Sequence, residues 1–276
     1  MSLRLKREIK ELMKSAGFSP KKLFGQNFLL SEKVLKQIAR VAGDGFDGTI
    51  LEIGPGLGFL TEQLLKRPGR IVAIEKDRLL ASYLKNKFED AGNFELLEDD
   101  ALKILADEKF TLAFEDYRVA ANLPYYLTSR FMRIMLELEN PPKEMILMVQ
   151  KEVADRICAQ PPKTNLLATA IQYFAKPKKL FKVQKSCFWP QPRVDSAVIK
   201  ITTMEARPKE DKEKFFSLVK TGFSQKRKTL FSNLKKSLKI DESALNSAFI
   251  ACNLDKKTRA ETLSQDEWKY LLNHLK

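Results

Sequence analysis

The alternation of short apolar runs with helical segments between residues 49 and 201 constrains the fold of this chain more than any other feature. The apolar runs predict strands near 49–53, 71–75, 94–98, 117–121, 145–150, 180–184 and 196–201. Amphipathic stretches with helical spacing lie between them, at 59–66, 78–88, 129–138 and 166–175. Such alternation is typical of βα units. We therefore expect an α/β fold with a seven-stranded, mostly parallel sheet.

The pattern of the sequence changes after Thr203 and predicts a helical part. Arg207 and Pro208 interrupt the chain, and helical patterns follow at about 209–222, 229–238, 242–252 and 264–275. The last pattern opens on Ser264-Gln-Asp-Glu267, which has the spacing of a capping box. We expect residues 206–276 to form a small all-α C-terminal domain.

The N-terminal residues are rich in positive charge. Residues 1–25 hold seven Lys or Arg and two Asp or Glu, on a helical pattern that ends near Gly17. An extended segment follows from Pro20. We expect a basic N-terminal extension over 1–24, followed by the α/β domain over 25–205.

Composition places the chain among ordinary globular proteins. Its apolar content is 44%, and its longest apolar runs, such as 145–149, are too short to cross a bilayer. The N-terminus lacks the apolar centre of a signal peptide, so we expect a cytoplasmic protein with no membrane contact. Three widely spaced cysteines and one histidine argue against a disulfide framework and against a zinc site.

The charge of the chain indicates a polyanionic partner. Forty-nine Lys and Arg against 35 Asp and Glu give a net charge of +14, which makes nucleic acid the first candidate. A lysine-rich surface that reflects genome composition or life at high temperature is the alternative that charge alone leaves open. Bases cluster at Lys176-Pro-Lys-Lys179 and at Lys226-Arg-Lys228.

Three glycines follow the first predicted strand, within Leu51-Glu-Ile-Gly-Pro-Gly-Leu-Gly58. Gly54, Gly56 and Gly58 would let the backbone approach a ligand with its polar groups exposed. A dinucleotide fingerprint would have Gly or Ala at position 59, where this chain has Phe59, so a pyrophosphate site is disfavoured. A purely structural glycine turn is the alternative.

Polar residues also follow the next strands in order. Glu75 ends the second strand, 75 − 58 = 17 residues after the last glycine, where an acid can hold a ribose diol. Asp100 follows the third strand and either accepts from an adenine amine or simply caps a helix. Asn122 ends the fourth strand. The carboxyl ends of parallel strands share one edge, so this order indicates a single nucleoside-binding site.

The tetrapeptide Asn122-Leu123-Pro124-Tyr125 suits methyl transfer to a weakly nucleophilic nitrogen. The exocyclic amine of adenine shares its lone pair with the ring. An Asn carboxamide oxygen and a backbone carbonyl can accept from the two amine hydrogens and favour a pyramidal nitrogen, while Tyr125 offers a ring on which a purine stacks. A strand that ends in an ordinary turn is the alternative.

With these motifs the chain resembles a known family, the ribosomal RNA adenine dimethyltransferases that use S-adenosylmethionine. Phe24-Gly-Gln-Asn-Phe-Leu29 resembles the family's cofactor-covering motif, Leu51 to Gly58 its first methyltransferase motif, and Asn122 to Tyr125 its catalytic motif. The resemblance covers nearly the whole chain and implies a Rossmann-like methyltransferase fold. It implies cofactor contacts from Asn27, Leu29, Gly54, Gly56, Glu75, Asp100 and Asn122.

A late loop, Phe188-Trp-Pro-Gln-Pro-Arg-Val-Asp-Ser196, also resembles a segment of that family. The resemblance implies that Phe188 stacks on a flipped adenine opposite Tyr125. The residues themselves indicate a stiff aromatic loop in which Arg193 can contact a phosphate. An aromatic plug over the sheet is the alternative, which fits Trp189 better than Phe188. We expect Asp195 to be a turn or cap residue.

The resemblance further implies an enzyme that dimethylates two adjacent adenosines in a hairpin loop near the 3′ end of small-subunit ribosomal RNA. Phe223-Ser-Gln-Lys-Arg-Lys-Thr-Leu230 resembles this branch, although the branch commonly has Arg at positions 226 and 231. We expect Lys226, Arg227 and Lys228 to contact RNA phosphates. A solvated helix face is the alternative.

The expected partner is small-subunit RNA within a pre-assembled subunit, and we expect a monomer that uses no metal. Alternatives are a large-subunit RNA adenine methyltransferase of the macrolide-resistance type, a noncatalytic ribosome-assembly factor, and a DNA adenine methyltransferase. The last usually carries a dedicated sequence-reading domain, of which the helical part shows no sign.

Overall fold

The computed structural model describes residues 2–20, 26–123, 127–205, 211–237 and 241–275. By its internal contacts the chain divides into two compact units. The sheet unit comprises Met1–Ala154 and Lys178–Thr203, and the helical unit comprises Asp155–Pro177 and Met204–Lys276.

These units differ from the expected domain boundaries in two places. The sequence analysis assigned 155–177 to the α/β domain, but helix α9 (Leu166–Gln172) packs against α10 (Lys212–Gly222) of the helical unit. The ring of Tyr173, just after α9, stacks on Phe215 of α10 with centroids 4.3 Å apart. The expected N-terminal extension belongs to the sheet unit, because its helix buries an apolar face there.

A seven-stranded sheet dominates the sheet unit, in the order β4-β3-β2-β5-β6-β9-β7. Its strands are β2 (Thr49–Ile53), β3 (Ile71–Glu75), β4 (Phe94–Glu98), β5 (Tyr117–Asn122), β6 (Glu144–Gln150), β7 (Ala175–Val183) and β9 (Ser196–Thr203). The strands from β4 to β6 are parallel, and β9 pairs antiparallel with β6. The expected seven-stranded, mostly parallel sheet is confirmed, although β7 begins earlier than expected.

The burial of the strands explains their composition. β3 is buried throughout, and β6 is buried from Met145 to Val149, since helices cover both faces of a parallel sheet. The edge strand β7 instead carries exposed lysines at 176, 178 and 179. Charged side chains on an edge strand discourage pairing with another chain.

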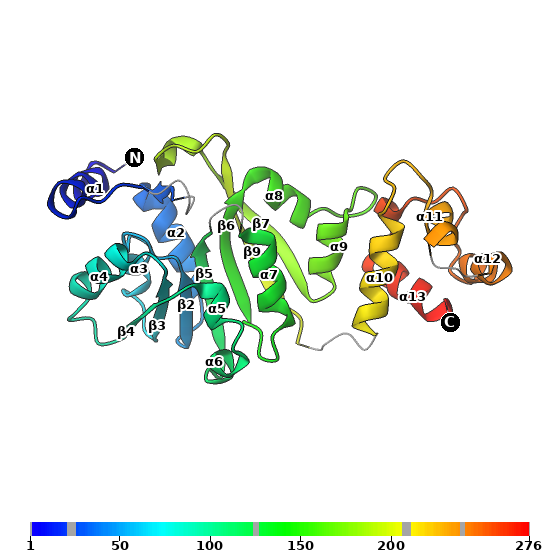
Figure 1. Ribbon diagram of the computed structural model, residues 1–276, viewed down its shortest axis with the longest axis horizontal. Helices are drawn as coiled ribbons and strands as arrows, with labels where there is room; N and C mark the ends of the chain where they lie inside the picture. The colour runs from blue at the N-terminus through cyan, green and yellow to red at the C-terminus, as the bar shows by residue number, and fades with distance from the viewer. Residues whose placement is uncertain (1, 21–25, 124–126, 206–210, 238–240, 276) are drawn as a thin grey trace. The chain divides into compact units, whose positions relative to one another are not determined.

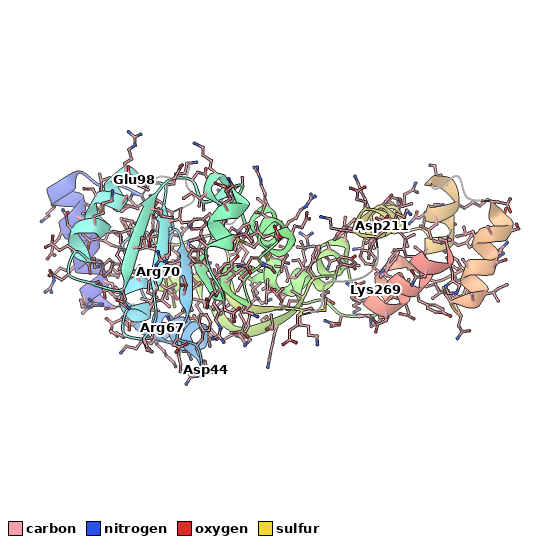
Figure 2. The ribbon with its side chains drawn as sticks, turned by 90° about the horizontal axis from the view of Figure 1, so that it is seen from below. Asp44, Arg67, Arg70, Glu98, Asp211 and Lys269 are labelled. Carbon is pink, nitrogen blue, oxygen red and sulfur yellow. The ribbon has the colours of Figure 1, made fainter. Side chains whose placement is uncertain are left out.

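The order of the strands creates a place for a ligand. The chain runs outward from β2 through β3 to β4 and then returns, so that β5 pairs with β2 on its other side. In sheets of this type a crevice opens where the order reverses, at the carboxyl ends of the strands. Glu98 ends β4 at this carboxyl edge, whereas Arg70, which precedes β3, lies at the opposite edge (Figure 2).

Helices flank this sheet in two groups (Figure 1). Helix α2 packs against β5 and β6, and α4 packs against β3 and β4. One group contains α2 (Glu32–Gly43), α3 (Thr61–Leu64) and α4 (Arg78–Lys87). The other contains α5 (Ala101–Ile104), α6 (Glu108–Leu112) and α7 (Thr128–Glu137), and α8 (Lys151–Ile157) follows β6.

Helices α2, α5, α6 and α8 lie outside the helices expected from the sequence. Helix α2 had a readable signal, since Ser31 caps it and its buried residues are Leu35, Ile38, Ala39 and Ala42, at helical spacing. The other three have between four and seven residues, so each offers at most two turns of periodic pattern.

Helix α1 (Leu3–Ala16) ends as expected, at Gly17 with a left-handed φ of 61°. Two short strands that were not expected, β1 (Phe28–Leu29) and β8 (Phe188–Trp189), pair antiparallel with each other. Strands of two residues carry no alternation that a sequence can reveal. Their pairing attaches the late loop to the segment that precedes α2.

The helical unit contains α9, α10, α11 (Leu230–Ser237), α12 (Glu242–Ala251) and α13 (Gln265–His274). Its core is formed by large apolar side chains, including Trp268, Phe215 and Phe249, each at most 1% exposed. The helices expected after residue 206 are confirmed, and so is the capping box between Ser264 and Glu267.

Three negative findings apply to the described part of the chain. No helix there has the length and apolar composition needed to span a bilayer. No group of three or more His, Cys, Asp or Glu side chains there is arranged to hold a metal ion. Cys158, Cys187 and Cys252 form no disulfide bond.

Candidate active site

A cavity of about 400 Å³ opens in the sheet unit at the carboxyl ends of β2, β3 and β5. Its volume is within the range of sites for small ligands and cofactors. The structure brings together around it every residue that the sequence analysis assigned to a cofactor: Asn27, Leu29, Gly54, Gly56, Glu75, Asp100 and Asn122.

The glycines form the floor of the cavity for conformational and steric reasons. Gly54 and Gly56 have φ values of 64° and 61°, in the left-handed region that favours glycine. A Cβ atom on Gly56 would also lie 3.1 Å from the Phe28 ring. Gly54 and Gly56 therefore present backbone without side chains to the cavity.

Glu75 is 6% exposed and both of its carboxylate oxygens are held by backbone. Oε2 accepts from the N–H of Gly56 at 3.0 Å, and Oε1 accepts from the N–H of Asp77 at 2.8 Å. Burial raises the pKa of Glu75, while these backbone hydrogen bonds act in the opposite direction. The arrangement fixes an acceptor beside the glycine loop, where it can bind hydroxyl hydrogens.

Asp100 has two partners in this structure. Its Oδ1 accepts from the N–H of Leu102 at 2.9 Å and so caps α5, and its Oδ2 pairs with Lys76 Nζ at 2.7 Å. The hydrogen bond from Lys76 lowers the pKa of the Asp100 carboxyl. The expected cap is present, and the same carboxylate lines the cavity.

Asn122 ends β5 with its side chain held in place. Its Nδ2 donates to the backbone carbonyl of Asn27 at 3.1 Å. The donor half of the carboxamide is therefore engaged by the protein, and the oxygen is the half suited to act on a substrate amine. Leu123 is 2% exposed, and Pro124 and Tyr125 lie outside the described residues.

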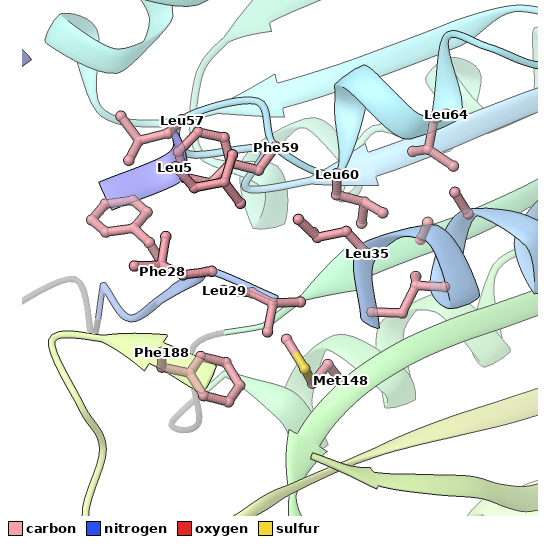
Figure 3. Close-up of a cluster of buried hydrophobic side chains, with 14 of the residues drawn as sticks. Leu5, Phe28, Leu29, Leu35, Leu57, Phe59, Leu60, Leu64, Met148 and Phe188 are labelled. Atoms are coloured by element: carbon pink, nitrogen blue, oxygen red, sulfur yellow. The ribbon is translucent and has the colours of Figure 1, made fainter. Parts of the chain in front are cut away.

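Phe188 is 1% exposed and packs in the core cluster with Phe28, Leu29 and Met148. Figure 3 shows its ring in this cluster, with Met148 beside it. Trp189 is only partly buried. The expectation that Trp189 would be the better plug is wrong, because the ring of Phe188 is the one buried in the core cluster. The predicted stacking of Phe188 on adenine remains a prediction.

Several residues that line the cavity were not predicted from the sequence, including Glu52 and Arg130. Glu52 of β2 is 2% exposed and accepts from the Thr61 hydroxyl at 2.7 Å. Its burial raises its pKa to about 8. A carboxylate inside an otherwise apolar strand was the available signal. Arg130 is exposed and lies near the start of α7.

The remaining predicted residues are not among those that line this cavity. Arg193 is exposed in the loop after β8, and Lys226, Arg227 and Lys228 are exposed between α10 and α11 of the helical unit. Asp195 accepts from the N–H of Lys185 at 2.9 Å and pairs with Lys182 at 2.8 Å. It braces the late loop, as expected of a turn residue.

Residues 17–276 match the model of the ribosomal RNA adenine dimethylase family. The chain belongs to this family. Enzymes of the family use S-adenosylmethionine, and this chain is accordingly an S-adenosylmethionine-dependent ribosomal RNA adenine dimethyltransferase. The recognition of the family from its motifs is confirmed.

Among curated proteins, the chain is 40% identical over 269 residues to ribosomal RNA small subunit methyltransferase A of Dehalococcoides mccartyi, which covers 96% of this chain and 91% of that protein. A crystal structure of a dimethyladenosine transferase from Plasmodium falciparum is similar with a TM-score of 0.72 and 25% identity, over 88% of this chain and 95% of that one.

The crystal structure of the 23S rRNA methyltransferase ErmE is also similar, with a TM-score of 0.72 at 23% identity, over 90% of this chain and 99% of that one. This likeness concerns the fold alone. Together with the sheet order it confirms the expected Rossmann-like methyltransferase fold.

Proposed function

We propose that this enzyme dimethylates the exocyclic amines of two adjacent adenosines in the hairpin loop near the 3′ end of small-subunit ribosomal RNA. The observation that carries the proposal is the position of Asn122, held by Asn27 at the edge of the cavity that contains the cofactor candidates. The name of the Dehalococcoides relative supports the choice of the small subunit.

The cavity suits S-adenosylmethionine by the chemistry of its lining. Glu75 would hold the ribose diol, and Asp100 would accept from the adenine amine. The backbone of Gly54 and Gly56, together with Asn27 and Leu29, would contact the rest of the cofactor. When bound, the cofactor supplies an electrophilic methyl group on its sulfonium.

Asn122 would act on the substrate amine. Its carboxamide oxygen and a backbone carbonyl of the tetrapeptide would accept from the two amine hydrogens and direct the nitrogen lone pair toward the methyl group. Leu123 and Pro124 would fix the backbone, and Tyr125 and Phe188 would stack on the adenine. After transfer the cationic nitrogen loses its proton to water, so the site needs no general base.

The RNA would be held largely through phosphates. Arg193 in the late loop and Lys226, Arg227 and Lys228 in the helical unit are exposed bases suited to such contacts. The proposed substrate is the RNA within a pre-assembled small subunit, met in the cytoplasm by a monomeric enzyme. The net charge of +14 supports an extended polyanionic partner.

A methyl-transfer assay tests the proposal. Labelled S-adenosylmethionine would be offered with undermethylated small subunits, large-subunit RNA and duplex DNA, and the modified bases identified. We expect dimethyladenine in the small-subunit 3′ hairpin alone. Label in large-subunit RNA would instead assign the enzyme to the other branch, and cofactor binding without transfer would favour an assembly factor.

A further inference from the structure

Lys87 of α4 is partly buried. It contacts the glycine loop and does not line the cavity. Its side chain is 16% exposed. Its Nζ pairs with Glu8 of α1, pairs with Glu62 of α3 at 2.7 Å, and donates to the backbone carbonyl of Leu57 at 3.1 Å. One ammonium group thus joins two helices to the loop between Gly56 and Gly58.

Aromatic rings surround the ammonium group of Lys87 and leave it dependent on its oxygen partners. Its Nζ lies 5.2, 5.3 and 5.6 Å from the ring centroids of Phe59, Tyr83 and Phe88. An ammonium group removed from water in this way requires its partners, because an unpaired buried charge is costly. The three oxygen partners fix where Nζ can lie, and therefore fix the Leu57 carbonyl that it holds.

Helix α1 supplies one of these partners and is itself firmly docked. Leu5 and Ile9 are buried in the core cluster, and Figure 3 shows Leu5 beside Leu57 and Phe59. The N–H of Ser2 donates to the carbonyl of Leu30 at 2.7 Å, and Arg4 pairs with Glu62 at 3.0 Å. Helix α1 therefore helps to hold the loop around Leu57 in place.

Lys87 pairs with Glu8 and Glu62, and Arg4 pairs with Glu62 and, at 3.6 Å, with Glu32. Burial acts to raise the pKa of Glu62, but Lys87 and Arg4 outweigh it and the pKa is lowered. Glu8 also accepts from the Tyr83 hydroxyl. Removing Lys87 would leave the carboxylates of Glu8 and Glu62 without the cation that both contact.

We propose that Lys87 is a positioning residue for the cofactor, and that α1 controls cofactor affinity by holding Lys87 through Glu8. The loop has left-handed glycines on both sides of Leu57, so without an anchor it would sample other conformations. The Leu57 carbonyl anchor restricts the loop to the form that faces the cavity, and binding then has less ordering to oppose it. This inference rests on the proposed role of the loop in cofactor binding.

The test uses the full chain and S-adenosylhomocysteine as the probe, with affinity measured by calorimetry. Lys87→Met should weaken binding by about tenfold or more, and Glu8→Gln by several-fold. The double variant should be no weaker than Lys87→Met, because the two residues act through one contact. Lys87→Arg, which keeps the charge, should restore part of the affinity.

Two exposed residues on the same helices provide matched controls. Glu11→Gln on α1 and Lys85→Met on α4 each remove a charge from a surface ion pair, and both should leave affinity within about twofold. Unchanged affinity in Lys87→Met, with only a lower melting temperature, would overturn the inference. A purely structural lysine would give that result.

Hydrogen exchange of the cofactor-free protein separates this inference from the proposed function. Amides of the loop from Gly54 to Gly58 should exchange faster in Lys87→Met and Glu8→Gln than in the parent protein. Equal exchange would contradict the anchor even if affinity fell. If the parent protein failed to bind the probe while exchange responded as expected, the proposed cofactor role of the loop would be at fault and the anchor would stand.

Discussion

The side chain of Asn122 donates to the backbone carbonyl of Asn27 at 3.1 Å, across 95 residues of sequence. This hydrogen bond joins the end of β5 to the segment just before β1. The two motifs that they represent are therefore parts of one site, and the cofactor-covering segment also orients the proposed catalytic amide. A shift of the backbone at Asn27 should therefore move the Asn122 carboxamide.

Asn122→Ala should reduce methyl transfer by at least about a hundredfold, as expected when a preorganised polar group is lost from a reaction centre. RNA affinity should stay nearly unchanged, because the proposed phosphate contacts come from other residues. Single-turnover transfer and equilibrium binding to small subunits would measure the two effects. A large loss of RNA binding would contradict the catalytic role.

Asp100→Asn and Asp100→Ala should separate the two functions of this residue. Asn is as good a helix cap as Asp, so Asp100→Asn should change the free energy of unfolding by less than about 0.5 kcal/mol, whereas Asp100→Ala should cost about 1 kcal/mol. Both should weaken S-adenosylhomocysteine binding if the carboxylate accepts from adenine. Urea unfolding and calorimetry would decide, and full affinity in Asp100→Asn would leave Asp100 as a cap alone.

Gly56→Ala should destabilise the protein by about 1–2 kcal/mol, because its left-handed φ is unfavourable for alanine. The new methyl group would also press on the Phe28 ring at the edge of the cavity. Gly56→Ala should also weaken cofactor binding. Gly92→Ala is the matched control, since no atom lies within 4 Å of its added Cβ, and it should be close to neutral in both measurements.

Phe188→Ala should lower the free energy of unfolding by about 3–5 kcal/mol, the cost of removing a buried aromatic ring. Trp189→Ala should cost clearly less, because that ring is only partly buried. Thermal or urea unfolding of the two variants gives the comparison. Equal losses would mean that both rings fill the core to the same extent.

The sequence predicted the sheet and the cavity lining because both leave local signals. Glu75 and Asp100 could be placed because each follows an apolar strand, and parallel strands end at one edge. The burial of Phe188 could not be predicted, since its ring packs in a cluster with residues distant in sequence, such as Leu29, 188 − 29 = 159 residues earlier. The same holds for Lys87, whose partners Glu8 and Glu62 come from distant helices.

Glu52 gives a prediction for the pH dependence of stability. Its pKa is about 8 in the folded protein, mainly because of burial, against an ordinary value of 4.5. The folded state then binds a proton that the unfolded state releases, so the contribution of Glu52 to stability is complete below about pH 4.5 and is lost as the pH rises toward 8. The slope should approach about 1.4 kcal/mol for each pH unit.

Glu52→Gln removes this titration and can still accept from the Thr61 hydroxyl. Its free energy of unfolding should therefore fall less between pH 6 and pH 8 than that of the parent protein, by an amount on the order of 2 kcal/mol. Glu95→Gln, on the exposed side of β4, is the control and should follow the parent curve. Parallel curves for Glu52→Gln and the parent would mean that Glu52 is ionised in the folded protein at neutral pH, with a counter-charge near β2 to balance it.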